Sequence, residues 1–406
     1  MRGFGLKTYP PDYSGPAAPP PSTSRYPYPL IFISAAEPSA DLHGASLIRA
    51  TQAACPTARF VGVAGPRMVE AGCDVIFNMT PHAAMLLSAV RVAGRAIAML
   101  QTAGRHLRRY PFDAAVVIDS PTLHLPLAAR AQAVGVPVMY YIAPQMWAWG
   151  AYRIHKLRNR VDRVAVIFPF EERYFRDRGV DATYVGHPLA EQISATPIDH
   201  AVLNGIRARG TPVITLLPGS RKHVIEAVLP GQLEVAEQIA SAFPEATFAV
   251  SVAGGHVASV ITHLLGACRV AVNQHPQNHA ELIQAADLVL AASGTTTLEV
   301  AFHRRPMIVM YNSSRLFYEL IGRWMIRTPH LALPNILAGR EIVPEFMPYY
   351  TSTRPIAERA IELLESEEAR RTMVRDLAQA VEPLRCGHAS ERAAAMLLDM
   401  LGRARH

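Results

Sequence analysis

The sequence predicts an α/β protein made of two consecutive doubly wound parallel-sheet domains that face a cleft. Short apolar runs of strand length recur along the chain, and helical patterns separate them, which indicates repeated βαβ units. The chain has 406 residues, and at roughly 150 residues per domain this length suits two or three domains. Half of the residues are hydrophobic and 18% are charged, as expected for domains with large buried cores.

The first domain is predicted over residues 29–203. An apolar run at 28–34 is followed by a small polar turn at 35–44 and by a helical pattern at 45–53. Continuous apolar runs are typical of central parallel strands, because helices cover both faces of such a sheet. Further strands are predicted at 59–64, 114–119, 137–142, 161–167 and 183–186.

The second domain is predicted over residues 204–375, after a stretch without strong periodicity. Its strand-like runs are 212–217, 247–252, 269–272, 288–290 and 306–310. Ligands of doubly wound sheets bind at the carboxyl ends of the strands, so the turns after these runs are candidate site segments. No G-x-G-x-x-G motif follows the first strand of the chain, which argues against a dinucleotide-dependent oxidoreductase.

Residues 1–28 are predicted to form a disordered or extended leader because they are rich in proline. They contain no apolar run of about 7–15 residues, so no signal peptide is predicted. No stretch of the chain approaches the roughly 18 apolar residues of a membrane span. The expectation is a protein that is soluble or lies on a membrane surface.

The net charge of +7 predicts attraction to phosphate groups or anionic lipid. No basic patch interleaved with aromatic residues and no nucleic-acid-binding module accompanies this charge, so no nucleic-acid partner is predicted. The four cysteines are widely spaced and form no C-x-x-C pair. This spacing argues against a disulfide framework and a zinc site, and it favours a reducing compartment.

A Ser/Gly/Thr turn after the predicted strand 288–290 is a candidate anion site. Here main-chain N–H groups and hydroxyls meet the N-terminus of a helical pattern at 298–303. Glu299 follows one helical turn later, within reach of a ribose hydroxyl. The alternative is a simple glycine-containing turn in which threonine caps the helix. The residues of the turn are Ser293, Gly294, Thr295 and Thr296.

A second candidate for phosphate binding ends the strand 212–217. Gly219 allows a tight turn, and Ser220 and Arg221 supply a hydroxyl and a guanidinium fork. The alternative is an ordinary turn at the end of a strand. Both turns lie at strand carboxyl ends of the same domain, so they are expected to converge on one diphosphate.

Asp119 is the candidate general base, since it ends an apolar strand at the predicted edge of the cleft. It could instead serve as a turn residue or a helix cap. Glu37, Asp41 and His43 share the first predicted loop, where they could bind polar sugar groups or cap the following helix. Ser39 lies too close to Asp41 and His43 in sequence to predict a hydrolase triad, and no G-x-S-x-G motif occurs.

Two further features, a pair of tryptophans and a basic segment, each allow two interpretations. Trp147 and Trp149 follow a strand and suit either the wall of an apolar or sugar site or the core. Residues 79–110 form a basic amphipathic segment with apolar positions on one helical face and arginines on the other. Such a helix can lie in an anionic membrane interface, or it can dock on its own sheet. Its arginines are Arg91, Arg95, Arg105 and Arg109.

Taken together, the motifs resemble the lipid-A-disaccharide synthase family of inverting glycosyltransferases. The resemblance runs from about residue 30 to the C-terminus, and the order and spacing of the motifs make it specific. The motifs of the first half are Glu-Pro-Ser-Ala-Asp-Leu-His-Gly at 37–44, Ile-Asp-Ser-Pro at 118–121, Ala-Pro-Gln-Met-Trp-Ala-Trp at 143–149, Phe-Pro-Phe-Glu at 168–171 and Gly-His-Pro at 186–188. Those of the second half are Leu-Pro-Gly-Ser-Arg at 217–221, the turn at 291–299 and Leu-Pro-Asn-Ile-Leu-Ala-Gly at 333–339.

The resemblance implies a GT-B fold, with a C-terminal helix at 376–406 that returns to the first domain. It implies transfer from UDP-2,3-diacylglucosamine to 2,3-diacylglucosamine 1-phosphate at the cytoplasmic face of the inner membrane, without a metal or other cofactor. The resemblance leaves open whether the protein forms a homo-oligomer. Asp119 would be the base, with Glu37 beside it in the cleft. The UDP-binding residues would be Ser220, Arg221, Ser293, Gly294, Thr295, Thr296, Glu299 and Asn335, and the acceptor side would hold Ser39, Asp41, His43, Trp147 and His187.

The chain departs from the family pattern in its first loop and after Arg221. Ala36, Pro38 and Ala40 replace a loop that usually contains two glycines, and Val224 stands where a glutamate is common. These departures keep two alternatives open. One is another UDP-sugar GT-B enzyme, either an epimerase or a transferase with a changed acceptor. The other is a non-catalytic relative that binds nucleotide sugar or lipid.

Overall fold

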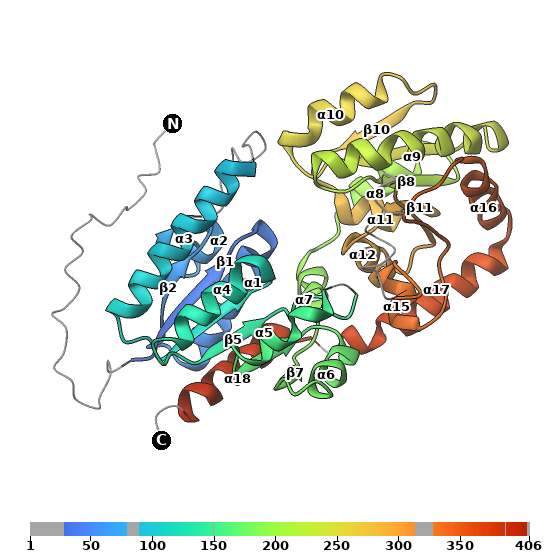
Figure 1. Cartoon of the computed structure of the whole chain (residues 1–406). Coiled ribbons are helices and arrows are strands. Elements are labelled where there is room, and N and C mark those ends of the chain that lie inside the picture. Colours follow the sequence, from blue (N-terminus) through green and yellow to red (C-terminus); the bar gives the residue numbers. More distant parts are fainter. Residues whose placement is uncertain (1–27, 79–88, 149, 313–327, 386, 404–406) are drawn as a thin grey trace.

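The computed structural model describes residues 28–78, 89–148, 150–312, 328–385 and 387–403. Nearly all of the predicted leader, the first part of the 79–110 segment and Trp149 therefore lie outside the described residues. The chain forms two parallel-sheet domains that follow one another in sequence (Figure 1). Two doubly wound parallel sheets were predicted, and the structure confirms them.

The first sheet has seven parallel strands in the order β3-β2-β1-β4-β5-β6-β7. The strand order reverses beside β1, where β1 pairs with both β2 and β4. Such a reversal opens a crevice at the carboxyl ends of the two central strands. The strands are β1 Leu30–Ala35, β2 Arg59–Val63, β3 Cys73–Phe77, β4 Ala114–Ile118, β5 Val138–Tyr141, β6 Arg163–Val166 and β7 Ala182–Tyr184.

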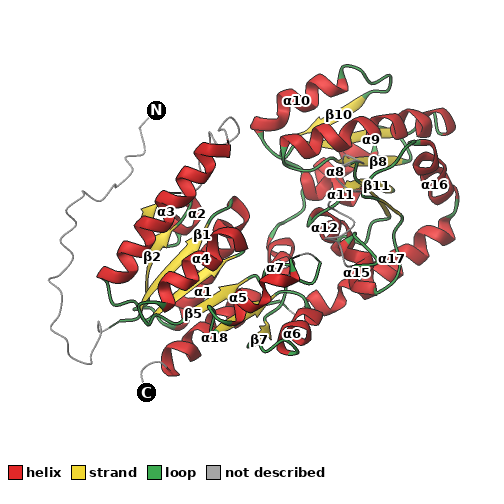
Figure 2. Cartoon of the chain, viewed as in Figure 1, coloured by secondary structure: helices red, strands yellow, loops and turns green. Residues whose placement is uncertain are grey.

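Helices cover both faces of this sheet (Figure 2). The alternation of side chains along β1 determines which residue packs on which face. Phe32 packs toward α3 and α4, whereas Ile31 and Ile33 pack toward α1 and the C-terminal helix α18, Ala389–Arg403. The helices of this half are α1 Pro38–Ala54, α2 Pro66–Glu70, α3 Ala89–Arg109, α4 Pro121–Gln132, α5 Ile154–Arg158, α6 Pro169–Arg176 and α7 Pro188–Ala195, with a 3₁₀ turn, η2, at Ala151–Arg153.

The second sheet has six parallel strands in the order β10-β9-β8-β11-β12-β13, and its order reverses beside β8. Its strands are β8 Val213–Leu217, β9 Thr247–Ser251, β10 Val272–His275, β11 Leu288–Ala292, β12 Met307–Met310 and β13 Glu345–Phe346. Its helices are α8 His200–Arg207, α9 Lys222–Ala242, α10 Gly255–Leu265, α11 His279–Ala285, α12 Thr296–Phe302, α15 Leu333–Ala338, α16 Arg354–Glu365 and α17 Glu367–Val381.

The chain then returns to the first domain through the 3₁₀ turn η4, Glu382–Arg385, and the helix α18, Ala389–Arg403. Ala393, Leu397 and Leu401 of α18 join the core beneath β1 (Figure 1). The predicted return of the C-terminal helix is therefore confirmed. The predicted limits at 203/204 and 375/376 fall inside α8 and α17, respectively, and both helices pack within the second domain.

Sequence patterns missed β3 and β13 and placed β10 three residues too early, at 269–272 instead of Val272–His275. All three lie at or near sheet edges, where half-exposed polar residues interrupt the apolar run. The helix α1 also begins earlier than predicted. Pro38 occupies its first turn, where proline is favoured, so Ser39, Asp41 and His43 lie in a helix rather than in a loop.

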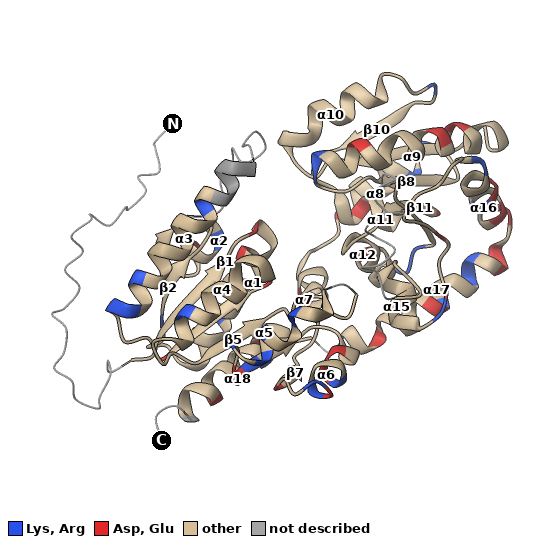
Figure 3. Ribbon diagram, viewed as in Figure 1, with Lys and Arg blue, Asp and Glu red and all other residues tan. Residues whose placement is uncertain are grey.

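The described part of α3 is docked on the first sheet. Met99, Ala103 and Leu107 are buried against it, while Ile97, predicted on the same apolar face, is 56% exposed. Arg105 and Arg109 point to solvent, and Figure 3 shows basic but no acidic residues along the described part of this helix. None of the helices in the described ranges is both long and apolar enough to span a bilayer.

Candidate active site

A cavity of about 840 Å³ lies between the two domains, at the carboxyl ends of both sheets. Its first wall comes from the segments that follow β1, β4, β5, β6 and β7, and its second wall mainly from those that follow β8, β9, β10 and β11. Most of the predicted site residues meet here. The cavity is lined by Ser39, His43, Asp119 and His187 of the first half, and by Ser220, Arg221, Thr295, Thr296 and Glu299 of the second.

Asp119 follows directly after β4 and has a strained main chain. Its φ is +54° and that of Ser120 is +47°, both in the left-handed region that non-glycine residues avoid. Each such residue costs on the order of 1–3 kcal/mol and persists only where the surroundings enforce it. This turn, which joins β4 to α4, projects the Asp119 carboxyl into the cavity.

Burial raises the pKa of the Asp119 carboxyl above its ordinary value. The main-chain N–H of Ser120 opposes this shift, Glu37 adds to it, and Arg221 opposes it. A raised pKa makes the ionised carboxylate a stronger proton acceptor, as a general base near neutral pH requires. The environment therefore suits the predicted role of Asp119.

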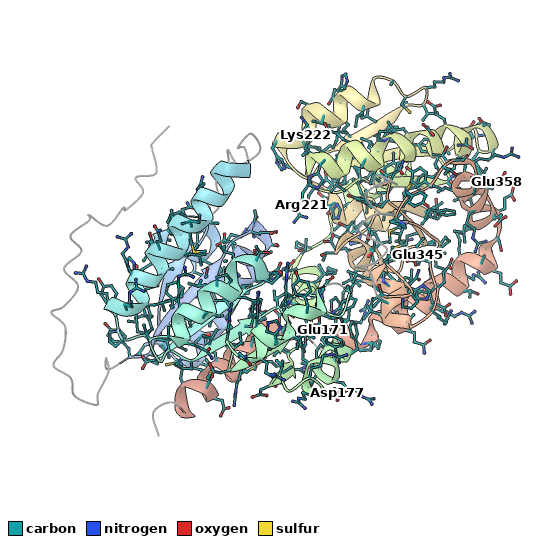
Figure 4. All side chains as sticks on the ribbon, viewed as in Figure 1. Glu171, Asp177, Arg221, Lys222, Glu345 and Glu358 are labelled. Atoms are coloured by element: carbon teal, nitrogen blue, oxygen red, sulfur yellow. The ribbon has the colours of Figure 1, made fainter. Side chains whose placement is uncertain are left out.

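Arg221 connects the two walls of the cavity. It precedes α9 and its guanidinium lies 3.2 Å from a carboxylate oxygen of Glu37, which follows β1. Figure 4 shows Arg221 on the side of the second domain that faces the first. Both side chains are more than a third exposed, and ion pairs of this kind are weak. The arginine can therefore exchange Glu37 for the phosphate of a ligand at little energetic cost.

The predicted Ser/Gly/Thr turn lies between β11 and α12. Thr295, Thr296 and Glu299 line the cavity, while Ser293 and Gly294 are exposed beside it. Thr297, one residue further, donates from its main-chain N–H and its hydroxyl to the Gly294 carbonyl and closes the turn. Gly294 has a φ of +140°, which favours glycine at this position.

A hydrogen-bonded chain behind Glu299 was not predicted from the sequence. His279 Nε2 lies 2.7 Å from Glu299 Oε2, and His279 Nδ1 lies 2.9 Å from the hydroxyl of Ser251. All three residues line the cavity. Ser251 ends β9 and His279 begins α11, so position at a strand end was the signal that could have found Ser251. These two hydrogen bonds fix the orientation of the Glu299 carboxylate.

Two cavity histidines are uncharged at neutral pH. Burial lowers the pKa of His43 to about 4, and burial, with a smaller contribution from His43, lowers that of His187 to about 3. His187 Nδ1 accepts a hydrogen bond from the main-chain N–H of Leu189. Neutral imidazoles can both donate to and accept from sugar hydroxyls.

Asp41 is not a cavity residue, contrary to the prediction. Its carboxylate is buried and accepts hydrogen bonds from the main-chain N–H groups of Gly65, Arg67 and Met68 at 2.9–3.1 Å. These are the donors at the N-terminus of α2, which a carboxylate stabilises. Its role is structural because α1 begins at Pro38 and turns Asp41 toward α2.

Asn335 and Trp147 are also placed in the core rather than in the cavity. Asn335 is fully buried, and its amide pairs with the main chain of Ile342 and Val343. The indole of Trp147 packs against Phe168 and Phe170 and donates to Glu171 at 2.8 Å. Neither residue lines the cavity in this structure, so their contacts favour a structural role for both and, for Trp147, the alternative of a core tryptophan.

In the ranges that the structure describes, no three His, Cys, Asp or Glu side chains are grouped closely enough to hold a metal ion. That the reaction needs no metal or other cofactor stays a prediction.

Comparisons with known proteins agree with this geometry. The family model described as lipid-A-disaccharide synthetase matches residues 31–397. The lipid-A-disaccharide synthase of Geobacter sulfurreducens is 35% identical over 378 residues, which covers 92% of this chain and 97% of that one.

Two solved structures share the fold at low identity. The Staphylococcus aureus MnaA–UDP structure has a TM-score of 0.63 at 13% identity and covers 92% of this chain and 97% of its own. Acinetobacter baumannii MurG has a TM-score of 0.54 at 12% identity and covers 93% and 100%. The predicted GT-B fold is confirmed. The chain therefore belongs to the lipid-A-disaccharide synthetase family, and it is a glycosyltransferase of lipid A biosynthesis.

Proposed function

We propose that this protein transfers 2,3-diacylglucosamine from its UDP conjugate to the 6-hydroxyl of 2,3-diacylglucosamine 1-phosphate, with inversion at the anomeric carbon. The observation that carries the proposal is the similarity to lipid-A-disaccharide synthases along nearly the whole chain, which spans both walls of the cavity. The products are lipid A disaccharide 1-phosphate and UDP.

In this reaction Asp119 accepts the proton of the acceptor hydroxyl. The hydroxyl oxygen forms a bond to the anomeric carbon, and the bond from that carbon to the UDP oxygen breaks, so that UDP leaves with the electron pair. Ser220 and Arg221 bind the diphosphate, with Thr295 and Thr296 from the neighbouring turn. Glu299, oriented by His279, accepts hydrogen bonds from ribose hydroxyls.

The acceptor binds on the wall formed by the first domain. Ser39, His43 and His187 line this wall and supply uncharged polar groups to the sugar. Glu37 lies beside them and becomes free of its ion pair when Arg221 turns to the diphosphate. This exchange allows the two domains to adjust around both substrates.

The experiment that tests the proposal supplies both lipid substrates to the purified protein in detergent micelles. The expected products are UDP and a disaccharide carrying one phosphate, in equal amounts. Formation of a 2-epimerised sugar without an acceptor would instead favour the epimerase alternative. Binding of UDP-sugar without any product would favour a non-catalytic relative.

We further propose that the protein binds the cytoplasmic face of the inner membrane through the basic surface of α3. Its substrates carry acyl chains, and each arginine near an anionic surface contributes about 1 kcal/mol. Replacing the four arginines by glutamine is expected to reduce sedimentation with vesicles that contain anionic phospholipid. The four are Arg95, Arg105 and Arg109, together with Arg91, whose side chain lies outside the described part of the structure.

The matched control neutralises four exposed arginines of the second domain, and it should sediment as the wild type does. Equal sedimentation of both variants with the vesicles would contradict the proposal that the protein binds the membrane through α3. The control arginines are Arg354, Arg359, Arg371 and Arg375.

A further inference from the structure

Two buried side chains converge on the main-chain carbonyl of Asp119. The hydroxyl of Tyr140 on β5 donates to this oxygen at 2.5 Å, and His124 Nδ1 on α4 lies 2.7 Å from it. Neither side chain is exposed to solvent. We propose that Tyr140 and His124 are positioning residues that aim the Asp119 carboxyl into the cavity by fixing its main-chain carbonyl. The inference rests on the proposed function, in which Asp119 is the base.

The main chain needs such support because it is strained on both sides of this carbonyl. Asp119 and Ser120 both have positive φ, and neither is glycine. The N–H of Asp119 still bonds to the Tyr141 carbonyl of β5, whereas the N–H groups of Leu123 and His124 already bond to Ser120. The peptide between Asp119 and Ser120 is therefore the pivot between β4 and α4, and two side-chain donors hold its oxygen.

The hydrogen-bond network determines which atoms donate. A carbonyl oxygen can only accept, so His124 Nδ1 carries the proton and its Nε2 accepts from the Ser34 hydroxyl at 2.9 Å. Ser34 lies on β1 and is fully buried. Burial lowers the pKa of His124 to about 4 and raises that of Tyr140. Both donors therefore keep the same protonation state across the physiological pH range.

Loss of one donor would leave the carbonyl under-satisfied in the interior and free the pivot to relax. The carboxyl would then leave its half-buried position, although none of the side chains that line the cavity has changed. Displacement of a catalytic group by about 1 Å costs on the order of 100-fold in rate. The expected signature is a fall in kcat of about 10- to 100-fold with little change in KM for either substrate.

The test compares variants that differ in one donor. Tyr140→Phe removes only the hydroxyl, and Tyr184→Phe is its control, because it removes a hydroxyl that donates to the Pro383 carbonyl outside the cavity. His124→Asn keeps a donor near the Nδ1 position, whereas His124→Gln places its amide near Nε2. We expect kcat to fall in Tyr140→Phe and His124→Gln and to be substantially retained in the other two.

A second measurement does not depend on the substrates. The Asp119 carboxyl, followed by carbon NMR in ¹³C-labelled protein, should have a lower pKa in Tyr140→Phe because it becomes more exposed. The charged groups acting on Asp119 are Glu37 and Arg221, and Arg153 acts on Tyr140; all three are retained. A merely structural role would lower the midpoint of thermal unfolding without moving this pKa.

Measurements on variants that also carry Asp119→Asn distinguish the positioning role of Tyr140 and His124 from the role of Asp119 as the base. If the pair acts through Asp119, adding Tyr140→Phe to this variant should cause no further loss of kcat. A wild-type kcat in Tyr140→Phe, an unmoved pKa or an additive loss in the double variant would each overturn the positioning role. Full turnover of Asp119→Asn alone would overturn the base assignment, and the pKa measurement would still decide the geometry.

Discussion

Replacing Asp119 by asparagine is expected to lower kcat for disaccharide formation by at least about 100-fold, the scale of losing a general base. This corresponds to about 2.7 kcal/mol of activation free energy. Asparagine keeps the size of the side chain and cannot accept the acceptor proton. UDP should still bind, because the residues proposed to hold it lie on the opposite wall of the cavity.

The pH dependence gives an independent check on this role. Since burial raises the pKa of Asp119, the acid limb of kcat/KM should lie above the ordinary value of 3.8. Activity should rise with pH through this limb, because the base must be ionised. The control is Asp177→Asn, an exposed residue that follows α6 and does not line the cavity (Figure 4). Near-normal turnover by Asp119→Asn would contradict the assignment.

Replacing Glu171 by alanine is expected to destabilise the first domain by about 3–5 kcal/mol. Its fully buried carboxylate accepts from the indole N–H of Trp147 and from the main-chain N–H groups of Ile167 and Phe168, at 2.8–3.2 Å. Each buried donor left without a partner costs about 1–3 kcal/mol. The midpoint of urea unfolding, measured at constant pH, gives the loss.

The pKa of Glu171 also leads us to expect that the stability of the protein depends on pH. Burial raises its pKa from 4.5 to about 7, although its three N–H donors oppose the shift. The folded state therefore holds this proton more tightly than the unfolded state, so wild-type stability should fall as the pH rises from about 4.5 to about 7. Glu171→Ala lacks this slope, and its deficit should be larger at the acid end of the range.

Glu358→Ala is the matched control for Glu171. Glu358 forms an exposed ion pair with Arg354 on α16, and such pairs contribute little (Figure 4). Its unfolding midpoint should stay close to that of the wild type. Equal midpoints for both variants would refute the structural importance assigned to the Trp147–Glu171 contact.

Sequence patterns were sufficient to predict the fold class, the order of the two domains and the principal residues of the cavity. Asp119, Arg221 and Glu299 were found because they follow apolar runs, and parallel sheets bring the carboxyl ends of their strands to one edge. Position along the chain was therefore enough to place them near a common site. Edge strands such as β3 and β13 were not predicted, because polar residues interrupt their apolar runs.

Which polar residues face the cavity and which support the main chain depends on contacts between residues far apart in sequence. Asp41, Asn335 and Trp147 carry the same chemical groups as site residues, but their partners are buried N–H or carboxylate groups elsewhere in the fold. The Ser34–His124 contact joins residues 90 positions apart. Partners at such distances are set by how β1, β4 and α4 pack, so no local pattern could predict that the Asp119 carbonyl is held from two sides.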